Sequence, residues 1–305
     1  MAPAGAPRVR EEAGACILEA PAALEAALRE LAARARVLLP RLESRLGVRA
    51  AAPYRIVLIP ARRGENRADP EIEALDAAAP PWASGFLIPA RRTGALRLAL
   101  ADRYPHSDAA SVLVHEAAHM LLHDAVAGDM PRWFGEGVAT GFEREWGLRD
   151  ILVYSTSLLT GRLPPLGDLD GAFGASAPQA RVAYAASFDF VRFTRRRHGA
   201  WIVRDIVREA GGRSFGEAWE AATGEPLERT EEAWRRDSLL LYRWVPALTG
   251  TGSLWAVITV LAFAAFARRR ARVRAIRERW EMEEGPERDE GPPGDGSTME
   301  EPDTR

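Results

Sequence analysis

Lysine is missing from this chain, and cysteine is almost missing. All 41 basic residues are arginine, against 43 acidic residues, so the net charge of −2 gives no electrostatic reason to expect a nucleic-acid partner. The single cysteine, Cys16, excludes an internal disulfide and a cysteine-rich zinc ribbon. Any metal site must therefore be built from histidine and carboxylate side chains.

Histidine is also rare, with five in 305 residues, yet three of them lie in one stretch, "VLVHEAAHMLLHD". This stretch has the pattern of an apolar helix, which Ser107 or Asp108 is suited to cap and Gly128 to end. Four residues separate His115 from His119, so on a helix both rings project from one face, about 6 Å apart along the axis. One metal ion can contact both rings.

Glu116 lies beside the first of these histidines, where a carboxylate reaches a water molecule on the ion rather than the ion itself. This is the HExxH pattern of zinc hydrolases, present here as "HEAAH". The alternative is a pair of packed or solvated histidines without a metal. Because the chain is poor in histidine and the surroundings are helical, we expect a metal site.

A catalytic zinc site needs a third protein ligand and keeps a fourth position open. His123 lies eight residues after His115, about 12 Å along the axis, which is too far to share one ion unless the helix breaks. Glu136 follows in "PRWFGEGVAT", where Pro131 suits the first turn of a second helix that folds back across the first. Glu136 is therefore the expected third ligand. We expect His123 to be packed or to support a ligand.

The rest of the chain mixes strands with helices. Apolar residues recur at helical spacing from 21 to 46, where Pro40 predicts a kink or a break. The segment "YRIVLIP" is typical of a buried strand, and residues 82–100 indicate a hairpin that contains Gly94. Further helices are expected at 178–197, 200–210, 214–223 and 228–243. The predicted class is α+β, with a small N-terminal sheet and a mostly helical C-terminal half.

The motifs resemble those of a known family. HExxH followed by a glutamate on the next helix is the gluzincin arrangement, and "PRWFGEGVATGFE" looks very like the "P-x-W-x-x-EG-x-A" signature of the peptidase MA-like group of bacterial zinc metallopeptidases. The segments "PPWASGFLIP" and "SFGEAWEAATGEPLERTEEAW" also resemble parts of that group. The resemblance covers roughly residues 20–240.

This resemblance implies a zincin-like fold in which His115, His119 and Glu136 ligate Zn²⁺. Glu116 would activate the water that attacks a bond of a peptide or protein substrate. Many gluzincins place a tyrosine on a helix after the ligand glutamate, so Tyr184 is the expected hydrogen-bond donor to the oxyanion.

Several of these roles have alternatives. Tyr184 is equally suited to anchor its helix as a half-buried aromatic residue, and Tyr154 and His198 are rival donors. Thr140, one turn after Glu136, is placed to hold a ligand histidine where some relatives carry an acid. Gly85 and the apolar "FLIP" after it are expected to form an edge strand that binds an extended peptide, as in similar enzymes, or else to belong to the core.

Near the C-terminus, the run "VPALTGTGSLWAVITVLAFAAFA" covers 23 uncharged residues from 245 to 267, enough to cross a hydrocarbon core of about 30 Å. The alternative is a buried core helix. Seven arginines follow within 268–279 and predict a cytoplasmic C-terminal side, with residues 1–243 extracytoplasmic. The N-terminus shows no export signal, so either the true start lies upstream or the orientation is reversed. The arginine asymmetry favours the upstream start.

Four segments are therefore expected along the chain. They are a disordered N-terminus (1–15), a zincin-like peptidase domain (16–243), a transmembrane helix (244–267), and a basic juxtamembrane segment with a disordered acidic tail (268–305). The predicted function is that of a membrane-anchored zinc metallopeptidase. The alternative is a catalytically inactive membrane-anchored module of the same fold that binds a partner.

Overall fold

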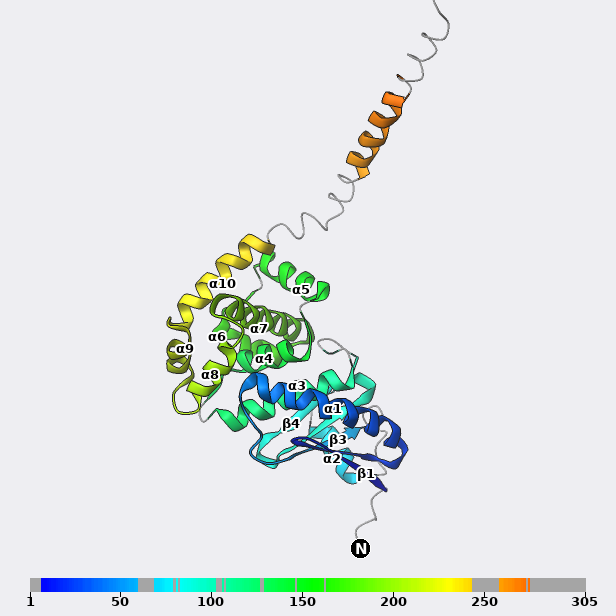
Figure 1. Cartoon of the computed structure of the whole chain (residues 1–305), viewed down its shortest axis with the longest axis vertical. Coiled ribbons are helices and arrows are strands. Elements are labelled where there is room, and N and C mark those ends of the chain that lie inside the picture. Colours follow the sequence, from blue (N-terminus) through cyan, green and yellow to red (C-terminus); the bar gives the residue numbers. More distant parts are fainter. Residues whose placement is uncertain are drawn as a thin grey trace, which may run out of the picture. The chain divides into compact units, whose positions relative to one another are not determined.

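The computed structural model describes residues 7–59, 69–78, 81, 83–102, 106, 108–126, 129–145, 147–161, 163–242, 258–272 and 274. Two compact units divide the chain, Met1–Pro246 and Ala247–Arg305. The first unit contains a five-stranded sheet and the helices that follow it (Figure 1). In the second unit, residues 258–272 are helical.

The sheet has the spatial order β1-β2-β3-β5-β4. Its strands are β1 (Arg8–Ala13), β2 (Cys16–Pro21), β3 (Tyr54–Ile59), β4 (Gly85–Ile88) and β5 (Thr93–Arg97). The central strands β2, β3 and β5 run parallel, while β1 and β4 pair antiparallel at the two edges. The edge position of β4 matters for function because an edge strand offers unpaired backbone groups on its outer side.

Both faces of the sheet are covered, as the side chains of β3 show. Ile56 and Leu58 join the main core beneath α1 (Glu25–Leu46) and α3 (Ala109–Ala125), which lie side by side in Figure 1. The alternate residues Val57 and Ile59 instead form a second cluster with residues of α2 (Pro70–Ala78). This alternation is the period of two expected of a strand, and its burial on both faces explains why residues 56–59 are all apolar.

The N-terminus departs from the predicted disorder of residues 1–15. Residues 8–13 form β1, which pairs antiparallel with β2 across a tight turn in which Gly14 has φ +60°. That backbone conformation suits glycine because it has no Cβ. The prediction failed because "RVREEA" is too polar to read as a strand, although pairing with β2 satisfies its backbone groups.

The predicted hairpin and helices upstream of the motif are present, with adjusted boundaries. The strands β4 and β5 are joined through Pro89–Arg91 and Arg92, while Gly94 lies within β5 opposite Leu87 rather than in the turn. Helix α1 is continuous, so Pro40 lies inside one helix and does not divide it. Asp108 caps α3 through a capping box with Ser111.

The second half of the first unit is helical, as predicted. Its helices are α4 (Arg132–Glu143), α5 (Leu148–Leu159), α6 (Leu166–Ala175), α7 (Ala177–His198), α8 (Ile202–Ala210), α9 (Phe215–Thr223) and α10 (Leu227–Tyr242). Buried aromatic rings join α4 and α7 to the later helices, with Phe190 stacked on Trp219 at 5.5 Å and Trp133 edge-on to Phe190 at 5.2 Å. The helix that carries the "EG" motif is therefore fixed in a rigid core.

The predicted transmembrane helix at 244–267 is corrected by the structure. Within the described residues, no helix combines the length and the apolar character that crossing a membrane requires. Residues 244–257 lie outside the described part of the chain. In the described helix, arginines follow directly after residue 267. The single-pass topology predicted from this run therefore has no support.

Candidate metal centre

Helix α3 presents the HExxH residues to a cleft beside the sheet. His115 and Glu116 are buried, with 3% and 6% of their surface exposed, and His119 is half-buried one turn later. The two ring Nε2 atoms lie 3.2 Å apart, because residues four apart on a helix share a face. Two imidazole nitrogens this close need a proton or a cation between them.

Helix α4 brings Glu136 to the same point. Its Oε2 atom lies 3.2 Å from His115 Nε2 and 3.3 Å from His119 Nε2. Gly137 permits this placement, because a Cβ at that position would lie 2.4 Å from the backbone oxygen of Ser187 on α7. The close approach of α4 to α7 thus orients Glu136 toward the histidines. His123, the rival ligand, is exposed rather than packed, and it belongs to neither of the two groups of described side chains that could hold an ion.

The three ligand atoms fit a zinc ion. A tetrahedral ion about 2.0–2.1 Å from each nitrogen and oxygen ligand holds those atoms about 3.3 Å apart. The separations of 3.2, 3.2 and 3.3 Å match this value. Two imidazoles, one carboxylate and an open fourth position form the ligand set of a catalytic zinc site.

The protonation of the ligands is set by their contacts. Burial disfavours the charge on His115, but hydrogen bonds to Glu136 and Glu143 outweigh burial and raise its pKa to about 10. Burial likewise opposes ionisation of Glu136, yet the charges of His119 and His115 hold its pKa well below the usual range. The carboxylate is therefore ionised at neutral pH, and a metal cation would replace the proton on His115 Nε2.

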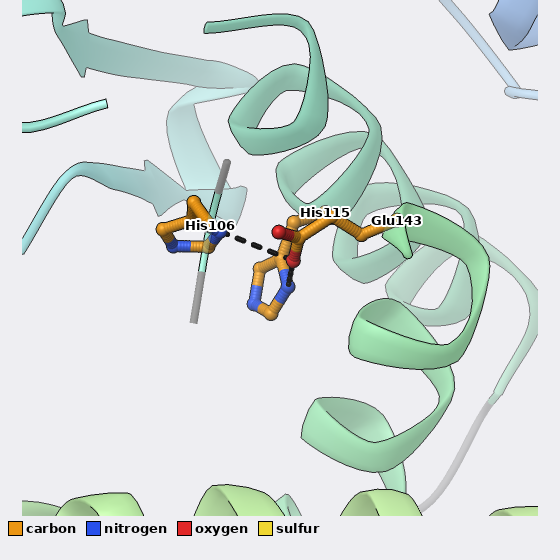
Figure 2. A group of neighbouring side chains, drawn as sticks. All are labelled: His106, His115 and Glu143. Carbon is orange, nitrogen blue, oxygen red and sulfur yellow. Dashed lines mark hydrogen bonds and ion pairs between the residues drawn. The ribbon is translucent and has the colours of Figure 1, made fainter. Parts of the chain in front are cut away.

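Glu143, at the end of α4, contacts the ring nitrogen of His115 that faces away from Glu136. Its Oε2 lies 3.0 Å from His115 Nδ1 and 3.1 Å from His106 Nδ1, so that the carboxylate stands between the two rings (Figure 2). Its side chain is fully buried. A carboxylate on the remote nitrogen fixes the ring orientation and makes the metal-facing nitrogen a better ligand.

Thr140 does not fill this role, contrary to our expectation. Its hydroxyl is buried and has no hydrogen-bond partner among the described residues. Glu143 lies seven residues after Glu136, two turns further on the same helix and one turn beyond Thr140. Helical spacing alone could have identified Glu143. No local pattern identifies His106, which precedes α3 in the chain.

Replacing Glu143 with glutamine is expected to lower zinc affinity about 10- to 100-fold, because the amide keeps the size of the side chain but removes the charge that His115 faces. Competition with a chromophoric chelator measures this. Glu145→Gln, an exposed position just after α4, is the control and should bind zinc as the unmodified chain does. Equal affinity in the two variants would show that His115 does not depend on Glu143.

Glu116 faces the cleft with its carboxylate packed against the edge strand. A Cβ on Gly85 of β4 would lie 2.6 Å from Glu116 Oε1 and 2.7 Å from Val112 Cγ1, so only glycine allows this approach. Burial raises the pKa of Glu116, although the charges of His115 and His119 oppose the shift. A raised pKa brings a carboxyl group closer to the range in which it can both accept and return a proton.

Tyr184 also lines this cleft, as the sequence led us to expect, and its rivals do not. Its ring lies 6.5 Å from that of His115, and burial raises the pKa of its hydroxyl well above the usual value, so the group remains a donor. Tyr154 is fully buried and its hydroxyl is hydrogen-bonded to Ser238. His198 lies at the far end of α7, 3.2 Å from Glu225.

The cleft has a volume of about 1070 Å³ and runs between the edge strand and helices α3, α4 and α7. Gly85, Phe86 and Leu87 form one side, and Tyr184 and Arg132 belong to the other. This volume is at the upper end of what ligand sites usually have and is open enough for a chain-like substrate. The metal ligands and Glu116 both line it.

No protein-family model matches this chain, and no curated protein matches it. The assignment of a function therefore depends on the site itself, where two imidazoles and a carboxylate converge at the spacing of a zinc coordination shell beside a buried glutamate.

Proposed function

We propose that this protein is a zinc-dependent peptidase of the gluzincin type. The convergence of His115 Nε2, His119 Nε2 and Glu136 Oε2 within 3.3 Å of one another carries the proposal. When bound, zinc would act as a Lewis acid that lowers the pKa of water and polarises the substrate carbonyl.

The protein's own residues supply the proton transfers. Glu116 is buried in the cleft with a raised pKa, so it is suited to take a proton from the attacking water and to pass it to the leaving amine. The Tyr184 hydroxyl is suited to donate to the oxygen that becomes negative, since burial keeps it protonated. Both groups act from fixed helices, which favours a single reacting geometry.

The edge strand explains why the substrate would be a peptide. β4 pairs with β5 along one edge, and its residues Gly85, Phe86 and Leu87 line the cleft. An extended peptide can therefore add to the sheet at the free edge of β4 through main-chain hydrogen bonds. Since Gly85 touches Glu116, a peptide paired with β4 would pass close to this carboxylate. Pairing with β4 would recognise the backbone of the substrate, so peptides of many sequences could bind.

The proposal is tested with the purified full chain loaded with zinc and a mixed peptide library. We expect cleavage that stops when a chelator removes the metal and returns when zinc is restored, with one zinc ion per chain by elemental analysis. Stoichiometric zinc without any cleavage would refute the peptidase and favour a metal-holding module that binds a partner.

A further inference from the structure

Two guanidinium groups line the cleft on the side opposite the edge strand. Arg132 lies one turn before Glu136 on α4, and Arg181 lies one turn before Tyr184 on α7, so each shares a helix face with a residue of the centre. The positive charge of Arg132 also acts on Tyr184, where it opposes part of the rise in the pKa of that hydroxyl. The two arginines and the tyrosine therefore form a continuous row along the α4–α7 wall.

Arg132 is held in place from two directions. Its Nε donates to Glu136 Oε1 at 3.2 Å, and its guanidinium lies 4.7 Å above the ring of Phe173, which is buried. Glu136 offsets part of its charge. Arg132 thus orients the third ligand and gives the wall a fixed cation.

Arg181 is in a different situation. Its side chain is exposed in the cleft and, within the part of the chain that the structure describes, it has no ion pair or hydrogen bond with an acidic group. Some other arginines of this unit are paired, such as Arg97 with Asp76 at 2.6 Å and Arg197 with Glu225 at 2.8 Å. Arg181 is therefore a cation that is available to a ligand.

The cleft carries charges of both signs, and on the α4–α7 wall the two arginines outnumber the one carboxylate, that of Glu136. Asp102, which follows β5 in the sequence, lines the cleft, whereas Arg132 and Arg181 belong to the helical wall. The N-terminal end of α7, which starts at Ala177, also borders the cleft and adds a favourable field for an anion. A guanidinium binds a carboxylate through two parallel hydrogen bonds, which makes this wall suited to that group.

We propose that the α4–α7 wall binds a carboxylate of the substrate near the scissile bond, with Arg181 as its principal contact. This inference rests on the proposed peptidase function and names its substrate class: peptides with an aspartate, a glutamate or a free C-terminus within about two residues of the cleaved bond. Arg181 lies one turn from Tyr184, so a carboxylate that reaches it belongs to a residue close to the reacting carbonyl.

The test uses the zinc-loaded full chain with matched peptides that carry glutamate or glutamine at each position near the cleavage site, and a free or amidated C-terminus. We expect kcat/KM about tenfold higher for the peptides with the carboxylate. Arg181→Gln should remove this preference, and Arg181→Glu should reverse it in favour of peptides with arginine at that position. Comparing the side-chain series with the terminal series identifies which carboxylate is recognised.

Arg229→Glu is the control, because Arg229 is another exposed helical arginine but lies on α10 outside the cleft. It should leave the preference unchanged. Binding to the zinc-loaded Glu116→Gln variant, measured by calorimetry with the same peptides, gives a second result that needs no hydrolysis. A carboxylate preference in binding that Arg181→Glu reverses supports the inference even if no peptide is cleaved.

Two results would overturn the inference. One is cleavage or binding that ignores the carboxylate, and the other is a preference that persists in Arg181→Glu. Either result would leave the peptidase proposal intact if zinc-dependent cleavage is observed, so the failures of the two proposals are distinguishable.

Discussion

Replacing Glu116 with glutamine is expected to lower kcat/KM for peptide hydrolysis by about 10²–10⁴-fold while the protein keeps one zinc ion. Glutamine has the shape of glutamate but cannot accept the proton of the attacking water. The three ligand atoms belong to His115, His119 and Glu136, so the coordination shell remains complete. Steady-state kinetics and elemental analysis of the same preparation measure both parts of the prediction.

Stability should not fall in this variant. Burial raises the pKa of Glu116 in the folded chain, so the group favours folding when protonated, and this contribution is lost as the pH rises through its shifted pKa. The neutral amide removes the cost of a buried charge, and the melting temperature at neutral pH should be the same or higher. Glu30→Gln, an exposed position on α1, serves as a control with normal activity. An active Glu116→Gln variant would exclude Glu116 as the base.

The convergence of His115, His119 and Glu136 could be predicted from the sequence because its geometry is largely local. The face shared by His115 and His119 follows from the helical repeat, and the structure places their nitrogens 3.2 Å apart. Glu136 required one further step, a second helix that folds back, and the turn before Pro131 indicated it. Gly137 allows α4 to pack closely on α7, and this packing orients Glu136 toward the histidines of α3.

The supporting residues could be inferred only in part, because helical spacing points to Glu143 but not to His106. Glu143 and His106 approach His115 from different elements, and the loop position of His106 gives no periodicity from which to infer a contact. The position of Arg132 beside the cleft that Tyr184 also lines likewise depends on how α4 faces α7, whereas its pairing with Glu136 follows from the spacing of four residues on one helix. Such contacts are set by tertiary packing, whereas the sequence encodes the spacing within each helix.

Hydropathy alone was the weakest guide in this chain. The uncharged run at 245–267 indicated a membrane span, whereas no helix among the described residues is long and apolar enough to form one. Conversely, the polar segment 8–13 was predicted to be disordered, but it forms β1, whose backbone pairs with β2 to complete the sheet. Composition over a window does not report which backbone groups find a partner.

Replacing Glu136 with alanine is expected to reduce zinc affinity by much more than about 100-fold, because a ligand itself is removed. Loss of a group that is only hydrogen-bonded to a ligand costs about 10- to 100-fold. Two histidines from one helix remain, and His115 keeps Glu143 as its only carboxylate partner among the described residues. Hydrolysis should be lost together with the metal. Equilibrium dialysis against buffered zinc measures the affinity, and circular dichroism shows whether the helices persist.

His123→Ala is the matched control, since His123 is the other residue that sequence spacing offers as a third ligand. It is exposed on α3 and belongs to neither of the two groups of side chains, among the described residues, that could hold an ion. This variant should bind zinc and cleave peptides as the unmodified chain does. The reverse pattern, with zinc retained in Glu136→Ala and lost in His123→Ala, would mean that α3 opens to coordinate the ion through three histidines. The convergence of α3 and α4, from which the role of Glu116 follows, would then have no part in metal binding.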